Sequence, residues 1–180
     1  ISRKLIILTF YRAYLAAADL SPMEALFTAL NERGFRVLGL FAPSLKTPDA
    51  ANWLSKQIAH LAPAAILNAT AFSGKGNSGS SPLDAGNVPV FQVALATSTK
   101  SAWVDEERGL SPSDFAMHVV LPAVDGRIFA DVTSFTEPQK GDAALQFSRF
   151  THAPDADRLA YVAYKLHAWV NLSARPVFER

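Results

Sequence analysis

The sequence contains no cysteine among its 180 residues. This absence excludes a disulfide framework, a thiolate metal site and a cysteine nucleophile, and it fits a reducing compartment, so the expected location is the cytoplasm. No apolar run approaches the roughly 18 residues that a membrane span needs, and no signal peptide follows Ile1, so we expect no membrane contact. The net charge of +1 comes without a basic stripe, which argues against a nucleic-acid partner.

The remaining composition is that of a folded protein. Hydrophobic residues make up 49% of the chain and charged residues 18%, which is enough apolar surface for a full core. The length predicts a single α/β domain, or a domain and a half, over residues 1–180. Because the chain starts at Ile1 and runs to Arg180 without an obvious stop, we expect a piece of a longer protein.

Four apolar runs bounded by turn residues predict buried strands. They are Lys4–Phe10, Phe35–Phe41, Ala64–Ala69 and Val88–Ala94. Amphipathic helical segments separate the first three runs. This alternation predicts a doubly wound, mostly parallel sheet with helices on both faces, of the Rossmann or flavodoxin-like type.

The second half of the chain predicts further elements. A strand is expected at 127–135, a short strand near 146–150, and a long C-terminal amphipathic helix at 155–172. Trp53 and Trp169 lie on apolar helix faces of the predicted helices. Replacing either with alanine should cost about 3–5 kcal/mol if the ring is fully buried.

Polar and aromatic residues follow the first and third strands, where ligands bind in open α/β sheets. The candidate ligand-binding residues are Tyr11, Arg12, Tyr14, Asn68, Thr70, Phe72 and Ser73. A doubly wound sheet commonly makes these two strands neighbours, which would bring the candidates together, with loop 73–84 hanging over them as a mobile lid. In the alternative interpretation, the same residues are structural caps at strand ends.

Several familiar motifs are absent from that loop. Gly74–Gly79 is not a phosphate-binding loop, because no Gly-Lys-Ser/Thr opens into a helix, and it is not a dinucleotide fingerprint. Ser73 is not on a G-x-S-x-G elbow.

His118 lies in an apolar run and is either a packed core histidine or a catalytic base or ligand. No catalytic triad and no set of residues at metal-ligand spacing is found, so no metal site is identified.

An ordered set of segments nevertheless resembles one family, the large CobN subunit of aerobic cobaltochelatase together with the H subunit of magnesium chelatase. The segments are Phe10-Tyr-Arg-Ala-Tyr14, Asn68-Ala-Thr-Ala-Phe-Ser73, Ser81-Pro-Leu-Asp84, Gly109-Leu-Ser-Pro-Ser-Asp114 and Met117-His-Val-Val-Leu-Pro-Ala-Val-Asp-Gly-Arg127. They cover most of the chain in the family's order, and only the loop at 74–80 matches poorly. Because members are far larger, the resemblance implies an internal fragment from the N-terminal half of such a subunit.

The resemblance also implies an activity, which is ATP-dependent insertion of Co²⁺ into hydrogenobyrinic acid a,c-diamide on the aerobic route to cobalamin. The large subunit is expected to bind the tetrapyrrole and the metal. Two further subunits, one of them an AAA+ ATPase, are expected to hydrolyse ATP, so Co²⁺ is a substrate and no cofactor is assigned to this fragment. Three alternatives stay open: a non-catalytic scaffold that docks the partner subunits, a magnesium chelatase subunit acting on protoporphyrin IX, and a free-standing sugar- or nucleotide-binding domain.

Overall fold

A single sheet runs through the computed structural model, which describes residues 3–77, 79–105, 109–138 and 150–172. Its strands are β1 (Leu5–Tyr11), β2 (Arg36–Ala42), β3 (Ala65–Asn68), β4 (Val90–Leu95), β5 (Ile128–Pro138) and β6 (Phe150–Pro154). Their order across the sheet is β2-β1-β3-β4-β5-β6. The pairings from β2 to β5 are parallel, and β6 pairs antiparallel with β5. The predicted mostly parallel α/β fold is therefore confirmed, and β1 and β3 are neighbours.

Each of the first four strands lies within two residues of its predicted bounds. The strand expected at 127–135 is β5, and its last three residues extend past that range to pair with β6. The short strand expected near 146–150 falls mainly outside the described residues. Of that range only Phe150 is described, and it begins β6.

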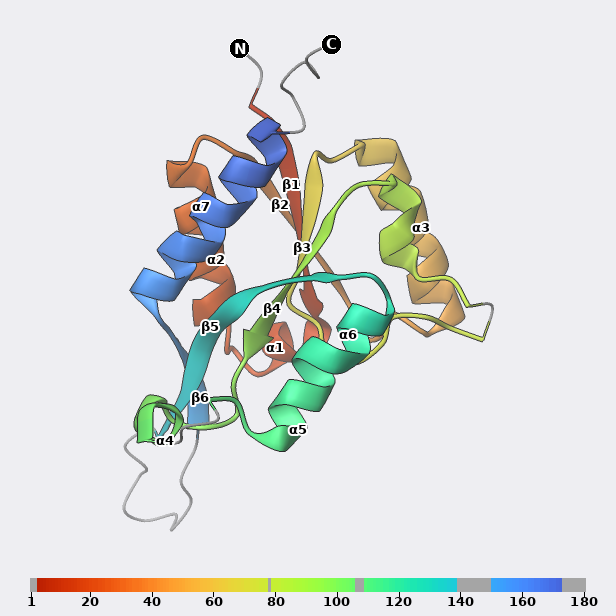
Figure 1. Ribbon diagram of the computed structural model, residues 1–180. Helices are drawn as coiled ribbons and strands as arrows, with labels where there is room; N and C mark the ends of the chain where they lie inside the picture. Colours follow the sequence, from red (N-terminus) through yellow and green to blue (C-terminus); the bar gives the residue numbers. More distant parts are fainter. Residues whose placement is uncertain (1–2, 78, 106–108, 139–149, 173–180) are drawn as a thin grey trace, which may run out of the picture.

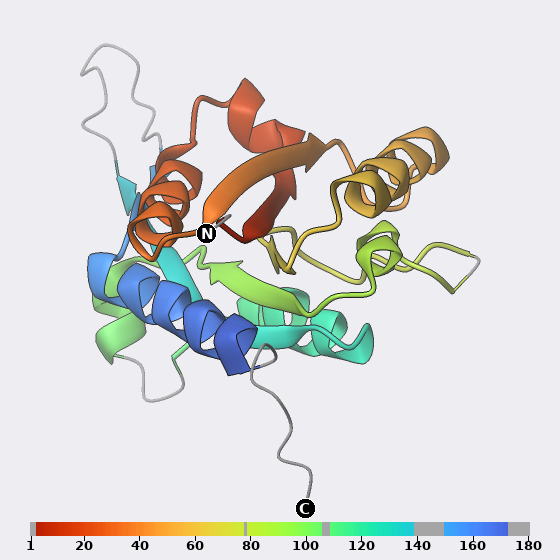
Figure 2. The same ribbon diagram turned by 90° about the horizontal axis from the view of Figure 1, so that it is seen from above.

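Helices cover both faces of the sheet (Figures 1 and 2). They are α1 (Arg12–Ala16), α2 (Ser21–Glu32), α3 (Pro48–Leu61), α4 (Lys100–Asp105), α5 (Pro112–Phe115), α6 (Leu121–Val124) and α7 (Ala156–Leu172), with a 3₁₀ turn η1 (Pro82–Gly86) and a π-helical turn η2 (Ala116–Val120) that joins α5 to α6. The helices α2 and α7 lie on one face. On the other face α3 packs with η1, and the α5–η2–α6 segment lies beside β4 and β5.

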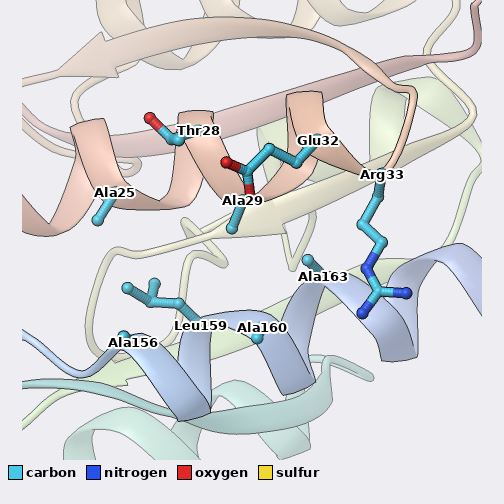
Figure 3. A pocket seen from close by; sticks show the side chains of 9 residues that line it. All are labelled: Ala25, Thr28, Ala29, Glu32, Arg33, Ala156, Leu159, Ala160 and Ala163. Atoms are coloured by element: carbon cyan, nitrogen blue, oxygen red, sulfur yellow. The ribbon is translucent and has the colours of Figure 1, made fainter.

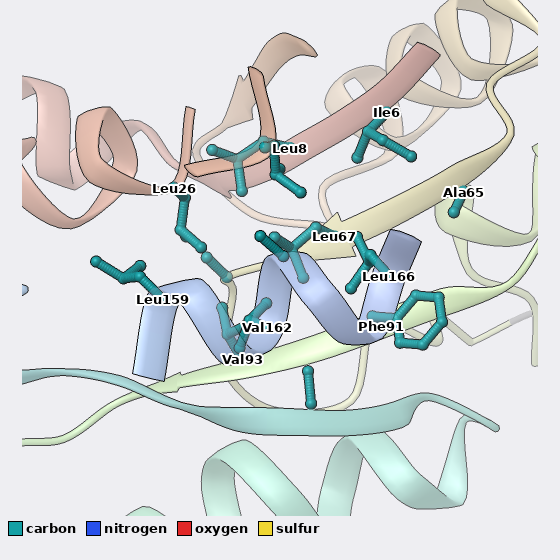
Figure 4. Close-up of a cluster of buried hydrophobic side chains, with 14 of the residues drawn as sticks. Ile6, Leu8, Leu26, Ala65, Leu67, Phe91, Val93, Leu159, Val162 and Leu166 are labelled. Carbon is teal, nitrogen blue, oxygen red and sulfur yellow. The ribbon is translucent and has the colours of Figure 1, made fainter. Parts of the chain in front are cut away.

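Alternation along β1 divides the core between these two faces, because successive side chains of a strand point to opposite sides. Ile6 and Leu8 pack toward α2 and α7, where Leu26 and Leu166 are fully buried (Figure 4). Leu5 and Ile7 belong to a second cluster that includes buried residues of α3 and η1. The two-sided burial of β1 explains why its sequence is an uninterrupted apolar run.

Full burial, the condition attached to the expected cost of replacing the two tryptophans, is not met. Trp53 on α3 is 47% exposed and Trp169 on α7 is 45% exposed. The helical periodicity placed both on apolar stripes, but those stripes are wider than the surface that the sheet covers. Trp169 keeps one edge-to-face contact with Phe91, with ring centroids 5.9 Å apart. The cost of about 3–5 kcal/mol that applies to a fully buried ring therefore does not apply to either residue.

Candidate functional site

The strand order reverses between β1 and β3, because the chain moves from β1 outward to β2 and then back across β1 to β3. In sheets of this order, 2-1-3-4-5, ligands bind outside the carboxyl ends of the strands at the reversal point. Here that edge is the bottom of the sheet in Figure 1, where α1, α5 and β6 surround it and both chain ends lie at the opposite side. We call it the carboxyl edge.

The floor of the carboxyl edge is a network of buried hydrogen bonds. Asn68 Oδ1 accepts from Thr9 Oγ1 at 2.7 Å and from Thr70 Oγ1 at 2.9 Å. Asn68 Nδ2 donates to Gln92 Oε1 at 2.7 Å, and Gln92 Nε2 donates in turn to the Thr70 carbonyl at 2.6 Å. All four residues are at most 2% exposed. The network links β1, β3 and β4, and every polar group of Asn68 has an internal partner.

The predicted residues therefore divide by exposure. Asn68 and Thr70 are enclosed in the network, whereas Arg12 at the start of α1 is exposed and Phe72 is 48% exposed with a positive φ of 66°. Tyr11 joins the two strand ends, since its hydroxyl donates to the Ala71 carbonyl at 2.7 Å. Burial raises the pKa of Tyr11, so the phenol stays protonated as the donor. Arg12 and Phe72 are thus the candidates whose side chains reach the surface beside this junction.

A histidine–aspartate pair stands at the β6 side of the same edge. His152 Nδ1 lies 2.6 Å from Asp19 Oδ2, and the His152 backbone N–H donates to Asp19 Oδ1 at 3.0 Å. The ring of Tyr14 meets the His152 ring edge-on, with centroids 5.6 Å apart. Burial, together with the nearby charge of Asp19, raises the pKa of Tyr14 to about 12. Tyr14 is thereby held neutral against the pair.

His118 lies on η2 and is 5% exposed, with no hydrogen-bond partner for Nδ1. Burial lowers the pKa of His118, and this outweighs the opposite effect of Asp114 one turn away. The net effect keeps the imidazole neutral. Asp114 itself is fully buried and accepts hydrogen bonds from the backbone and the hydroxyl of Thr97. His118 is therefore a packed side chain with an unpaired ring nitrogen.

The start of loop 73–84 is anchored to the turn that follows α6. Asp125 accepts from the Ser73 hydroxyl at 2.8 Å and from the Gly74 amide at 2.7 Å. Gly74 has no room for a side chain, because a Cβ there would lie 2.8 Å from Ser81 Oγ. The hydroxyl of Ser73, which was predicted to donate to a ligand, thus donates to Asp125 instead.

The other end of the loop is held by the same turn. Arg127 Nη1 lies 2.6 Å from Asp84 Oδ1, and Leu83 is 1% exposed in the core beneath α3. The expected lid over the carboxyl edge is not what the structure shows. Both loop ends are tied down on the α3 face of the sheet, and the loop extends to the right in Figure 1, away from that edge.

Sequence reasoning missed Asp19, Gln92, Asp114, Asp125 and His152. A polar Gln inside the apolar run of β4 was a visible signal, since a buried amide needs partners. Asp19 and His152 are 133 residues apart, and nothing in their local sequence joins them.

Among the described residues no group of three or more acidic, histidine or cysteine side chains is placed to hold a metal ion. In the same part of the chain no helix is both long and apolar enough to cross a membrane.

A groove of about 360 Å³ lies between α2 and α7, away from the carboxyl edge (Figure 3). Its walls are mostly alanines, among them Ala25, Ala29 and Ala160. At one end Arg33 reaches toward α7, and its guanidinium carbon is 5.7 Å from the centre of the Tyr164 ring. Small side chains account for this hollow, and the polar side chains of its lining, Thr28, Glu32 and Arg33, all come from α2 and the residue that follows it.

Comparison with known proteins decides the family. The model of a family described as CobN/magnesium chelatase matches residues 2–180. The chain belongs to the CobN/magnesium chelatase family. An aerobic cobaltochelatase subunit CobN from Sinorhizobium sp is 33% identical over 95% of this chain, and one from Pseudomonas aeruginosa is 29% identical over 99% of it. The resemblance read from the ordered segments is therefore confirmed.

The structural comparison agrees with the sequence comparison. The catalytic subunit of cobaltochelatase from Mycobacterium tuberculosis superposes on 97% of this chain with a TM-score of 0.79 at 25% identity. The chain spans 14% of the length of each curated CobN relative and 15% of that solved chain. It corresponds to one portion of a much larger CobN-type subunit.

The family's ordered segments now have structural roles in this chain. Ser81 and Asp84 cap η1 reciprocally, and Asp84 also pairs with Arg127. Ser111 caps α5 by accepting from the Asp114 amide at 3.1 Å. The Asp84–Arg127 pair joins two of these segments that are far apart in sequence, and the two caps define where η1 and α5 begin.

Proposed function

We propose that this chain is part of the tetrapyrrole-binding large subunit of an ATP-dependent cobaltochelatase. The full subunit inserts Co²⁺ into hydrogenobyrinic acid a,c-diamide on the aerobic route to cobalamin, in the cytoplasm. Co²⁺ is a substrate of the reaction. Two further subunits, one an AAA+ ATPase, hydrolyse ATP.

Within this chain we propose the carboxyl edge between β1 and β3 as a surface that contacts the tetrapyrrole. The observation that carries the proposal is the hydrogen bond of 2.7 Å from Tyr11 to the Ala71 carbonyl, which joins the two strand ends at the reversal of strand order. On either side of that bond stand an exposed guanidinium, Arg12, and a half-exposed ring, Phe72. A corrinoid with carboxylate and amide arms around an apolar macrocycle needs both kinds of group.

The buried network supports this surface from below. Asn68 and Thr70 position the β3 end through bonds to Thr9 and Gln92, so in this proposal they act on the ligand through the backbone that carries Phe72. In this proposal Tyr14 and Ser73 also support the surface and do not contact the ligand. Tyr14 packs against the His152 ring, and Ser73 donates its hydroxyl to Asp125.

Two alternatives predict different results. If the chain is a scaffold that docks the other subunits, the carboxyl edge is a set of structural caps and the macrocycle binds elsewhere in the subunit. If the protein is the H subunit of a magnesium chelatase, protoporphyrin IX and Mg²⁺ replace the corrinoid and cobalt. Both metals and both macrocycles therefore belong in the test.

The experiment is a titration of the full-length subunit with hydrogenobyrinic acid a,c-diamide, followed by absorption. We expect Arg12→Ala to weaken binding by about 1.5–3 kcal/mol, on the order of 10- to 150-fold in Kd, because a charge-assisted hydrogen bond is lost. Phe72→Ala is expected to weaken it as well. Arg33→Ala, at the groove between α2 and α7, is the matched control and should bind like the parent.

The edge is not the site if Arg12→Ala and Thr70→Ala both bind the tetrapyrrole like the parent and the rate of metal insertion with ATP and partners is also unchanged. His118→Ala serves as a further comparison, since His118 was the sequence-based candidate for a base. Preferential binding of protoporphyrin IX and insertion of Mg²⁺ would favour the magnesium chelatase alternative.

A further inference from the structure

The Asp19–His152 pair is the feature of the carboxyl edge that the binding surface alone does not explain. Asp19 accepts from the ring and from the backbone amide of the same histidine, at 2.6 Å and 3.0 Å, so the imidazole is held at two points. The two side chains are only 13% and 17% exposed. Tyr14 closes one side of the ring with its edge-on contact.

The geometry determines which nitrogen of His152 is basic. An ionised carboxylate only accepts hydrogen bonds, so the contact from Asp19 requires the hydrogen on Nδ1. The neutral ring then carries its lone pair on Nε2. A carboxylate that fixes the tautomer and stabilises the imidazolium is the arrangement that makes histidine an effective general base.

His118 is less suited to that role. Its Nδ1 is buried without a partner, and burial lowers its pKa despite the opposite effect of Asp114, so a proton placed there would have no hydrogen-bond acceptor. The His152 side chain is 17% exposed, and Asp19 is a negative partner for the charge it would acquire.

We propose that the Asp19–His152 dyad is the proton acceptor of the carboxyl edge, with His152 Nε2 as the base and Asp19 as its positioning residue. This assignment rests on the proposed tetrapyrrole binding at that edge. As the metal enters, an inner N–H bond of the macrocycle breaks. The electron pair stays on nitrogen and forms the bond to Co²⁺, and the proton moves to Nε2 and from there to water. No oxidant or reductant takes part.

The test uses the full-length subunit with its partner subunits and ATP, and it measures two quantities. One is the Kd for hydrogenobyrinic acid a,c-diamide, and the other is the single-turnover rate of Co²⁺ insertion. In His152→Gln and Asp19→Asn we expect a Kd close to that of the parent, whereas the insertion rate falls by on the order of 100-fold in His152→Gln because general-base catalysis is lost. His60→Gln, an exposed histidine on α3, is the matched control and keeps both parent values.

A third variant separates chemistry from folding. In His152→Ala we expect added imidazole to restore part of the insertion rate, which a purely structural contact between the α1–α2 connection and β6 would not allow. A parent-like rate in His152→Gln would overturn the dyad while leaving tetrapyrrole binding in place. A parallel loss of binding and rate, without imidazole rescue, would make the pair a structural latch and also overturn it. If the parent subunit does not bind the tetrapyrrole, the proposed function fails and the dyad fails with it.

Discussion

Asn68→Ala should be among the most destabilising single substitutions in the chain. The change removes one side chain that serves three buried partners: the hydroxyls of Thr9 and Thr70 and the Oε1 atom of Gln92. A buried polar group left without a partner costs about 1–3 kcal/mol, so the simple sum is about 3–9 kcal/mol. Because the two hydroxyls can rotate toward other acceptors, we expect about 3–5 kcal/mol, a large share of the stability of a typical domain.

Two further variants make the test quantitative. Thr9→Val keeps the shape of the side chain and leaves Asn68 Oδ1 with the donors from Thr70, so it should cost only about 1 kcal/mol. Asn52→Ala, an exposed change on α3, is the control and should be neutral or slightly stabilising because alanine favours helix.

The free energies of unfolding are measured by urea denaturation of the 180-residue chain, with equal m values as the check that the variants unfold alike. If Asn68→Ala costs no more than Thr9→Val, the cooperative network that supports the carboxyl edge does not exist as described.

The remaining predictions concern the loop and the buried histidine. Asp125→Ala removes the acceptor of the Gly74 amide, so trypsin should cut after Lys75 faster than in the parent. The exposed change Asp49→Ala is the control and should leave the rate of cleavage unchanged. Equal cleavage rates in all three proteins would refute the anchoring of the loop by Asp125. Burial lowers the pKa of His118 below its ordinary value of 6.5, so the unfolded chain takes up a proton first and the free energy of unfolding should fall as the pH drops below about 6.5. In His118→Gln this part of the acid sensitivity should be smaller in pH-dependent urea denaturation, and an unchanged pH dependence would contradict the assignment.

The sequence by itself determined the sheet and much of its order. The uninterrupted apolar run of Lys4–Phe10 predicts a strand buried on both faces, because only a strand covered by helices on both sides lacks polar alternation. The alternation of such runs with helical segments then predicts a parallel sheet, in which β1 is commonly a central strand. The resemblance to the CobN family was also readable, because it depended on short segments in a fixed order along the chain.

Only the tertiary structure decided what the residues at the carboxyl edge do. Asn68 and Ser73 look like free donors in the sequence, yet they bond to Gln92 and Asp125, which are distant in the chain, and local sequence carries no record of such partners. Helical periodicity similarly placed Trp169 on an apolar stripe but could not say how wide a surface the sheet would cover. The pairing of Asp19 with His152 arises because β6 returns antiparallel to β5 at the end of the sheet, which brings together two residues that are 133 positions apart in the chain. Contacts of that kind depend on how the elements pack, so they become visible only when the fold is assembled.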